Sequence, residues 1–214
     1  VYMIGVFGGS FDPIHFGHIN PLMELSEQFK FSAIRLIATY KSPASKIFHS
    51  EPSHRHNMAS IIASSTTNNF IADDIEIREE GVSYTYETIK KLKNTLKNED
   101  ICLIIGLDVF LDIETWYNYK KMMEEVNIIV VNRPDFNIKS TENMDSSILG
   151  KIVKNKEIFL GRKKGCIFFY ETPNIGISST SIRNIIGKGE IPSGMIPGSI
   201  MSYIKRNKLY TEKI

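Results

Sequence analysis

The sequence has little of what several classes of protein depend on. Its 214 residues include two cysteines, Cys102 and Cys166, and each lies inside an apolar run. This placement predicts buried thiols and argues against a disulfide framework or a cysteine metal site. No apolar run approaches the roughly 20 residues of a membrane-spanning helix, and no secretory signal stands out. We therefore expect a cytoplasmic protein with no membrane partner.

An excess of charge of one sign is also missing. The 26 basic and 24 acidic residues give a formal net charge of +2, and hydrophobic residues make up 42% of the chain. Such a balance needs no broad nucleic-acid-binding face, so we expect no nucleic-acid partner. The length suits one domain with a full core, and no internal repeat divides the chain. We therefore expect a single domain over 1–214.

Apolar segments alternate with amphipathic ones along the whole chain. Strands are predicted over 3–7, 33–39, 70–78, 101–105, 127–132 and 166–171. Helices are predicted over 20–29, 54–67, 146–153 and 192–209, and after 83–85. The unbroken apolar run 101–105 is typical of a central strand, whereas 70–78 fits an edge. The pattern predicts an α/β fold, a Rossmann-like open parallel sheet with helices on both faces.

The segment 8–18, GGSFDPIHFGH, joins the first predicted strand to the first helix. In an open parallel sheet such a turn lies at the carboxyl ends of the strands, where ligands bind. Gly8 and Gly9 permit unusual backbone angles and let an oxygen-rich ligand approach the amide groups. The helix start that follows offers unpaired N–H groups and partial positive charge, which suit a phosphate.

His15 and His18 stand three positions apart at that helix start, a spacing that puts both imidazoles on one face. They could donate hydrogen bonds to the oxygens that gain charge during phosphoryl or nucleotidyl transfer. The same residues could instead be a purely structural pair of turn histidines or part of a metal site. We expect no protein-bound metal, because no third ligand of His, Cys or acidic type stands at a suitable spacing.

A second helix start of this kind comes late in the chain, at 177–183 (ISSTSIR). Its hydroxyl residues suit a helix N-cap, which would point the backbone amides outward. Arg183 lies in the first turn, where the helix dipole disfavours a cation, and a bound polyphosphate would explain it. Within the single domain, residues 166–214 would thus supply the last strand, a phosphate-binding turn and the C-terminal helices.

The predicted helix 54–67 also begins with a basic first turn, which opposes the helix dipole. We expect a partner for Arg55, either an acidic side chain or a substrate phosphate, with the acidic side chain favoured. Ser50 and Ser53 are candidate caps for this helix. The nearby histidines are expected at the surface: His49, His54 and His56.

Three further places carry residues suited to binding. Asp108 follows Gly106 at the end of the fourth strand, where it could accept hydrogen bonds from ribose hydroxyls or cap the next helix. Trp116 and Tyr117 could stack on a planar ring or pack under a helix. Lys46 lies in a polar loop, from which it could reach a phosphate or be solvated.

These features carry a resemblance to a known family. The motif at 8–18 resembles the signature of the HxGH nucleotidyltransferase superfamily, which includes nicotinate mononucleotide adenylyltransferases, phosphopantetheine adenylyltransferases and cytidylyltransferases. Over nearly the whole chain, further segments resemble landmarks of the bacterial nicotinate mononucleotide adenylyltransferases, and they follow in the same order: 83–85, 106–108, 115–117, 133–134 and 177–183.

This resemblance implies that the adenylyl group of ATP is transferred to nicotinate mononucleotide, giving deamido-NAD and pyrophosphate in NAD biosynthesis. It implies Mg²⁺ bound with ATP, and it gives the catalytic role to His18 with His15 assisting. The residues implied to contact ATP are Gly8, Gly9, Ser10, Phe11, His15, His18, Gly106, Asp108, Ile177, Ser179, Thr180 and Arg183. Those implied to contact the mononucleotide are Ser10, Lys46, Thr85, Trp116, Tyr117 and Arg133.

One loop departs from the family pattern. The family commonly has Pro-Pro-His-Lys after the second strand, whereas 42–46 reads SPASK here, which keeps the lysine and lacks the histidine. Nicotinamide mononucleotide therefore stays open as the acceptor. The alternatives are another acceptor such as phosphopantetheine, a cytidylyltransferase, or a non-catalytic nucleotide sensor on the same fold, although intact His15, His18 and Arg183 weigh against a sensor. It also leaves open whether the chain forms a homo-oligomer.

Overall fold

The computed structural model describes residues 3–44, 46–67, 69–97, 99–132, 141–173 and 176–211. The chain forms two compact units, each built from separate stretches of sequence. Unit 1 comprises Val1–Phe7, Phe29–Ser32 and Tyr84–Asn174. Unit 2 comprises Gly8–Gln28, Ala33–Ser83 and Ile175–Ile214, and therefore contains the motif 8–18.

The strands form a seven-stranded sheet in the order β3-β2-β1-β4-β5-β7-β6. Their bounds are β1 Met3–Gly9, β2 Ala33–Ala38, β3 Phe70–Asp73, β4 Asp100–Gly106, β5 Asn127–Asn132, β6 Ile152–Val153 and β7 Ile167–Glu171. The registers are parallel, as in the pairs Ile4 with Ile101 and Ile37 with Asp73. The predicted α/β fold with a parallel sheet is confirmed, including the central place of β4 and the edge place of β3.

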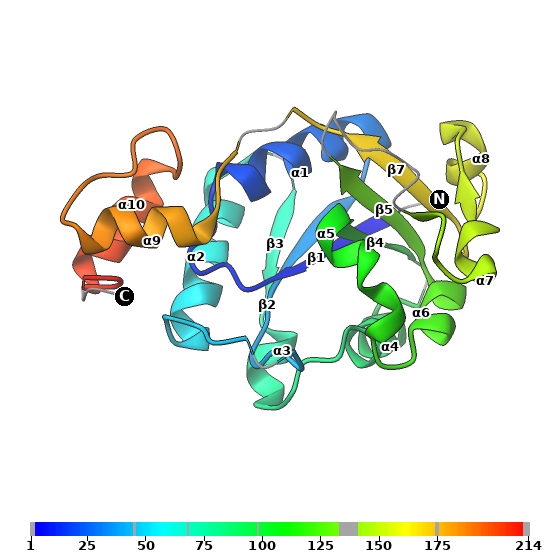
Figure 1. Ribbon diagram of the computed structural model, residues 1–214, viewed down its shortest axis with the longest axis horizontal. Coiled ribbons are helices and arrows are strands. Elements are labelled where there is room, and N and C mark those ends of the chain that lie inside the picture. The colour runs from blue at the N-terminus through cyan, green and yellow to red at the C-terminus, as the bar shows by residue number, and fades with distance from the viewer. Residues whose placement is uncertain are drawn as a thin grey trace. The chain divides into compact units, whose positions relative to one another are not determined.

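Unit 1 contains β4 to β7 and a set of mostly short helices (Figure 1). The helices are α4 Thr85–Thr95, α5 Leu107–Leu111, the 3₁₀ turn η1 Ile113–Thr115, α6 Tyr119–Glu125, α7 Ser146–Leu149 and α8 Lys156–Leu160. The apolar run 101–105 is buried throughout, which explains why β4 needs cover on both faces. Lys93 ties α4 to α6 through an ion pair with Glu125.

Unit 2 contains β2, β3 and the helices α1 Phe16–Phe29, α2 Pro52–Ser65, α3 Ile75–Glu79, α9 Ser179–Gly187 and α10 Gly198–Arg206, with Phe29 itself in unit 1. The helix α2 packs on β2, β3 and α10 and buries Met58 and Ile62. The helix α10 faces inward with Ile200 and Ile204. Among the described residues, no helix is both long and apolar enough to cross a membrane.

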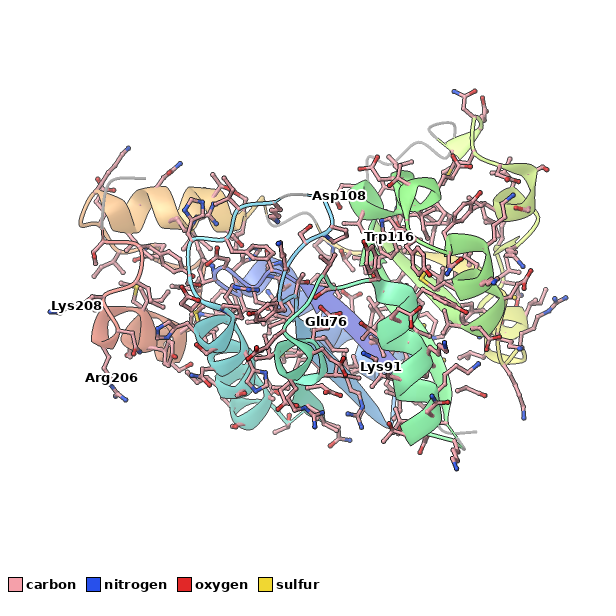
Figure 2. All side chains as sticks on the ribbon, turned by 90° about the horizontal axis from the view of Figure 1, so that it is seen from below. Glu76, Lys91, Asp108, Trp116, Arg206 and Lys208 are labelled. Atoms are coloured by element: carbon pink, nitrogen blue, oxygen red, sulfur yellow. The ribbon has the colours of Figure 1, made fainter. Side chains whose placement is uncertain are left out.

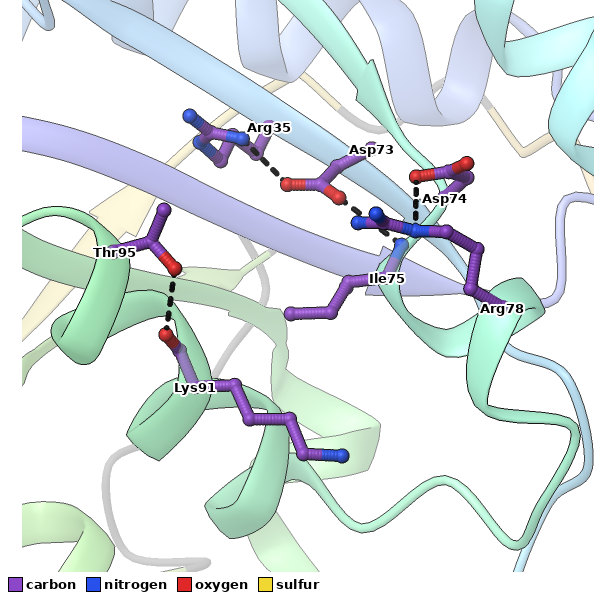
Figure 3. A network of polar contacts seen from close by, with 7 residues as sticks. All are labelled: Arg35, Asp73, Asp74, Ile75, Arg78, Lys91 and Thr95. Carbon is purple, nitrogen blue, oxygen red and sulfur yellow. Dashed lines mark hydrogen bonds and ion pairs between the residues drawn. The ribbon is translucent and has the colours of Figure 1, made fainter.

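The predicted strand 70–78 is wrong in its second half. The strand β3 ends at Asp73, and α3 follows it directly. The carboxylate of Asp73 accepts a hydrogen bond from the backbone N–H of Ile75 at 3.0 Å, and Arg78 pairs with Asp74 one helical turn earlier at 2.9 Å (Figure 3). These contacts close a helical turn over residues whose alternating pattern is also typical of a strand.

Other boundaries differ from the predictions for identifiable reasons. The predicted helix 146–153 stops at Leu149 with Gly150 as its C-cap, and 152–153 form β6 instead. The last helix covers only Gly198–Arg206 of the predicted 192–209, because Pro192 and Pro197 precede it. Neither Ser50 nor Ser53 caps α2, whose N-cap residue is Glu51.

Candidate active site

His15 and His18 lie against each other at the start of α1. The carbonyl of His15 accepts the N–H groups of His18 at 2.8 Å and Ile19 at 3.1 Å, so the helix begins on this residue. The two imidazole centroids are 3.8 Å apart, with ring planes tilted by 32°. The backbone N–H of His15 also donates to His18 Nδ1 at 3.3 Å. The prediction that this spacing brings the two rings together is confirmed.

Both imidazoles lie in surroundings that favour the neutral form. Burial lowers the pKa of His15 from 6.5 to about 4. The pKa of His18 is lowered well below 6.5, first by burial and then by the positive charges of His15 and Lys46. The Nδ1 atom of His15 is buried and has no hydrogen-bond partner within the described part of the chain. At pH 7 each ring therefore offers one N–H donor and one acceptor nitrogen.

The glycines of the motif serve close packing. A Cβ atom on Gly17 would lie 2.9 Å from His15 Nδ1, and one on Gly9 would lie 2.8 Å from Cε1 of Phe11. Around Gly8 nothing lies within 4 Å of such an atom, so that position is open to a ligand. The prediction of unusual backbone angles at Gly8 and Gly9 is wrong, because the positive φ of the turn, 50°, belongs to Phe11.

Asp12 anchors the turn from inside. Its side chain is 2% exposed, and its carboxylate accepts three hydrogen bonds, each of 2.6 Å. The donors are the backbone N–H of His49 and the hydroxyls of Ser50 and Tyr210. Burial and the neighbouring Asp12 raise the pKa of Tyr210, which keeps this phenol protonated as a donor. Ser50, one of the two candidate caps of α2, thus donates its hydrogen bond to a carboxylate that is distant in sequence.

The helix α9 holds the main chain of the same turn. The hydroxyl of Ser179 donates to the carbonyl of Pro13 at 3.0 Å, and Arg183 donates to the carbonyl of Asp12 at 2.7 Å. A second guanidinium nitrogen of Arg183 donates to Thr180 Oγ1 at 3.2 Å. The predicted helix start at 177–183 is confirmed, with Ser178 as the N-cap in a capping box. Two helix starts therefore meet at residues 12–18.

The side chain of Arg55 also holds the turn, through hydrogen bonds to backbone carbonyls. Its guanidinium is fully buried and donates to the carbonyl oxygens of Ser10, Thr39, Tyr40 and Ser50. Its Cζ atom also lies 4.1 Å from the centroid of the Phe48 ring. The prediction that Arg55 pairs with an acidic side chain or a substrate phosphate is therefore wrong. Its guanidinium forms hydrogen bonds to backbone oxygens instead. Burial lowers the pKa of Arg55, and nearby acidic groups led by Asp12 partly offset this effect.

Lys46 lies at the open side of the turn. Its side chain is exposed, and Nζ lies 3.4 Å from the hydroxyl of Ser10. The positive charge of Lys46 is one of the causes that lower the pKa of His18. The lysine retained in the altered loop 42–46 is thus held beside the histidines.

Unit 1 carries the expected ribose- and ring-binding residues. Asp108 is exposed in the first turn of α5, and its Oδ1 lies 2.7 Å from where a Cβ atom of Gly106 would be. A side chain at position 106 would therefore displace the carboxylate of Asp108 from this place. Asp108 and Trp116 lie on neighbouring segments around α5 and η1 (Figure 2). Asp108 does not cap α5, since the N-cap residue is Gly106.

An aromatic cluster surrounds the start of α4. The ring centroid of Tyr117 lies 5.1 Å from that of Tyr84 and 6.2 Å from that of Tyr86, the two neighbours of Thr85. Tyr117 is 52% exposed and Tyr84 is 38% exposed. Trp116, next to Tyr117 in sequence, is half-buried. Flat apolar surface is thus available next to Thr85 for a planar ring.

The predicted site residues divide between the two units. Unit 2 holds Gly8, Gly9, Ser10, Phe11, His15, His18, Lys46, Ile177, Ser179, Thr180 and Arg183. Unit 1 holds Thr85, Gly106, Asp108, Trp116 and Tyr117, and Arg133 lies outside the described residues. In the described ranges, no three side chains of His, Cys, Asp or Glu gather to hold a metal ion.

Sequence reasoning missed the inner supports of the turn. The local pattern accounts for Asp12 only as turn chemistry, and it assigns no role in the site to Gly17, Ser50 or Tyr210. The one signal in the sequence is the basic residue Arg55 at a helix start, which points to an unidentified partner. The other contacts join residues far apart in the chain and leave no local pattern.

Comparison with known proteins places the chain in a family. The model of the cytidylyltransferase-like family matches residues 6–185. A relative from Shewanella pealeana, named probable nicotinate-nucleotide adenylyltransferase, is 32% identical over 97% of this chain and 95% of its own length. The chain belongs to the nicotinate-nucleotide adenylyltransferases of the cytidylyltransferase-like family.

Other members of the family agree with this placement. A relative of the same name from Methylococcus capsulatus is 29% identical over 98% of this chain and 100% of its own length. The structure of Plasmodium falciparum nicotinic acid mononucleotide adenylyltransferase complexed with NaAD matches with a TM-score of 0.75 at 24% identity, covering 98% of both chains. This last likeness supports the fold of the nicotinate-nucleotide adenylyltransferases over the whole chain.

Proposed function

We propose that this chain transfers the adenylyl group of ATP to nicotinate mononucleotide, giving deamido-NAD and pyrophosphate. The observation that carries the proposal is the neutral His15–His18 pair, 3.8 Å apart, on a turn that α9 holds through Asp12 and Pro13. Relatives of up to 32% identity and nearly equal length, named for this reaction, support it. A pair of neutral N–H donors held in place suits the stabilisation of charge on phosphate oxygens.

The proposed reaction is a direct in-line displacement. A phosphate oxygen of the mononucleotide attacks the α-phosphorus of ATP, the bond to the β-phosphate oxygen breaks, and pyrophosphate leaves with the electron pair. The chain's part is to position the reactants and to stabilise charge on the α-phosphate oxygens. His18 donates its N–H to an oxygen that gains charge, and His15 assists from beside it.

The binding roles are proposed residue by residue. ATP phosphates are assigned to the motif 8–18 and to the residues of 177–183, and adenosine to Gly106 and Asp108. In the free protein Ser179 and Arg183 also hold the turn, so part of their contribution is positional. The mononucleotide is assigned to Ser10, Lys46, Thr85, Trp116 and Tyr117, and to Arg133.

Mg²⁺ enters this proposal as part of the ATP substrate. The described side chains form no cluster of three ligand residues, and the carboxylate of Asp12 is already bonded to three protein donors. We therefore derive no step from a protein-held metal. A cation of this kind keeps several waters and binds chiefly to substrate phosphates.

The same proposal includes one nucleotidyltransferase domain acting in the cytoplasm. Relatives match over 97–98% of this chain and at least 95% of their own length, which supports a single functional unit. The two cysteines are free, buried thiols, in keeping with a reducing compartment. Cell fractionation with an antibody to the native chain tests the location.

The decisive experiment compares two acceptors side by side. Dinucleotide and pyrophosphate formation are measured with ATP and Mg²⁺ and either nicotinate or nicotinamide mononucleotide. We expect kcat/KM to favour the acid, which would make the altered loop 42–46 a tolerated variation. A preference for the amide would mean that the loop has changed the specificity. Binding of ATP without turnover of either acceptor, or of phosphopantetheine, would contradict the proposal and favour a sensor.

A further inference from the structure

The C-terminal segment reaches back to the motif at the other end of the chain. The hydroxyl of Tyr210 donates to Asp12 Oδ1 at 2.6 Å, across 198 positions of sequence. The same hydroxyl lies 3.1 Å from that of Ser50, which donates to the same carboxylate oxygen. Tyr210 is only 6% exposed, so this contact is made out of water, where a hydrogen bond to a charged group is strong.

The backbone around Tyr210 is held in an uncommon conformation. Lys208 and Tyr210 have φ values of 53° and 60°, in the left-handed region that bulky residues rarely adopt. The N–H of Leu209 meanwhile bonds to the carbonyl of Ile204, which ties the segment to the end of α10. Such backbone conformations persist where the surroundings determine them, and here the fixed point is the phenol in its place on Asp12.

Asp12 transmits this contact to the histidines. It stands three positions before His15, and the carbonyls of Asp12 and Pro13 are held by Arg183 and Ser179. The residue that precedes His15 by three positions is thus held at two places, at its carbonyl by α9 and at its carboxylate by the donors around it. The two hydroxyls and one N–H on that carboxylate set its position.

We propose that Tyr210 is a positioning residue for adenylyl transfer, whose hydroxyl fixes Asp12 and thereby the geometry of the His15–His18 pair. The phenol is buried against Asp12 and acts through it, not on the substrate. This inference rests on the proposed function only in naming the reaction that the histidines serve. The geometric part, that Tyr210 sets the imidazole positions, stands without it.

The chain offers a matched control for the test. Tyr203, on α10, also uses its hydroxyl to join the C-terminal segment to the rest of unit 2, with His54 Nδ1 at 2.8 Å and Asn57 at 3.0 Å. It touches α2 and not the histidine turn. Tyr210→Phe and Tyr203→Phe therefore each remove one hydroxyl with two close partners from the same segment, and only the first loses a contact to Asp12.

The first readout is steady-state kinetics with thermal unfolding beside it. We expect Tyr210→Phe to lower kcat about tenfold or more, the scale for a small misplacement of a catalytic group, with KM for the mononucleotide within about twofold. Tyr203→Phe should keep kcat within about twofold. Ser50→Ala, which removes the other hydroxyl on Asp12 Oδ1, should lower kcat as Tyr210→Phe does. Equal losses of Tm in both tyrosine variants with unchanged kcat would overturn the proposal and leave Tyr210 a structural contact.

The second readout does not depend on the reaction. In ¹H–¹⁵N spectra of the histidine rings at pH 7, Tyr210→Phe should shift the signals of His15 and His18 and leave that of His54 in place. Tyr203→Phe should do the reverse. If the unmodified chain makes no dinucleotide but this crossed pattern appears, the proposed function fails and the positioning role holds. If His15 and His18 do not respond to Tyr210→Phe, the positioning role fails whatever the activity.

Discussion

Around the histidine turn of unit 2, polar groups are bonded to one another and buried, whereas Tyr84 and Tyr117 of unit 1 keep much of their surface exposed. Asp12 is 2% exposed with three donors, and Arg55 is fully buried with four carbonyl acceptors. Tyr117, by contrast, is 52% exposed and is in contact with two other tyrosine rings.

The difference matches the chemistry assigned to each unit. Charge that develops on a reacting phosphate is best met by donors that need no rearrangement, so a rigid, internally bonded turn suits catalysis. A planar ring is bound by stacking, which needs flat exposed surface more than fixed hydrogen bonds. We therefore expect substitutions around the histidine turn to affect stability and kcat, and substitutions in the aromatic cluster of Trp116 and Tyr117 to affect the binding of the mononucleotide.

The largest effect is expected at the buried guanidinium. Arg55→Met would leave the carbonyls of Ser10, Thr39, Tyr40 and Ser50 without this donor, and we expect a loss of at least about 3 kcal/mol in the free energy of unfolding. Urea unfolding measures it. Arg78→Met is the control, because Arg78 is 68% exposed in a surface pair, and it should change the stability by less than about 1 kcal/mol. Equal losses of unfolding free energy in the two variants would show that the hydrogen bonds of Arg55 add no particular stability.

The next effect is expected in the rate. His18→Ala removes a donor at the reacting phosphate and should lower kcat roughly 10²-fold or more, with KM for the mononucleotide little changed. Single-turnover formation of the dinucleotide separates this loss from slow product release. A variant with nearly normal turnover would refute the catalytic role of the pair.

A smaller effect is expected in unit 1. Trp116→Ala should weaken binding of the mononucleotide by about 1–3 kcal/mol, the scale for stacking of a ring on an aromatic side chain, and leave kcat close to that of the unmodified chain. Calorimetric titration with nicotinate mononucleotide measures this directly. Trp116→Phe keeps a flat ring and should recover most of the affinity. If neither variant changes the affinity, Trp116 is a packing residue.

The last effect is a dependence of stability on pH, which is expected only in acid. Because the pKa of His15 falls from 6.5 to about 4 on folding, the unfolded chain binds a proton that the folded chain does not in this range. Stability should therefore fall as the pH is lowered from 6.5 toward 4, by up to about 1.4 kcal/mol per pH unit from this group. His15→Asn should flatten the dependence. An unchanged dependence in His15→Asn would mean that burial of His15 is not the cause.

The sequence predicted the sheet well because its strands are local apolar runs. The segment 127–132 forms β5 with the expected bounds, and the run 101–105 lies in the central strand. The prediction from the sequence failed at 75–78, where the alternating apolar residues fit a short helix as well as a strand. Side-chain contacts of Asp73 and Asp74 stabilise the helix there.

For the site, the sequence predicted what spacing and helix starts determine. The contact of His15 with His18 follows from three positions along a helix, and the start of α9 follows from its hydroxyl residues. The role of Ser50 was missed because its partner, Asp12, lies 38 positions away. The unfavourable position of Arg55 was visible, but local rules could not tell a carboxylate partner from backbone oxygens.

The bond from Tyr210 to Asp12 also has a consequence for the order of synthesis. On the ribosome the motif 8–18 emerges long before Tyr210, whose phenol completes the set of donors around Asp12. A nascent or prematurely terminated chain therefore carries the two imidazoles without this hydrogen bond to Asp12. On the positioning role proposed for Tyr210, a product truncated before residue 210 would carry the motif and lack the geometry.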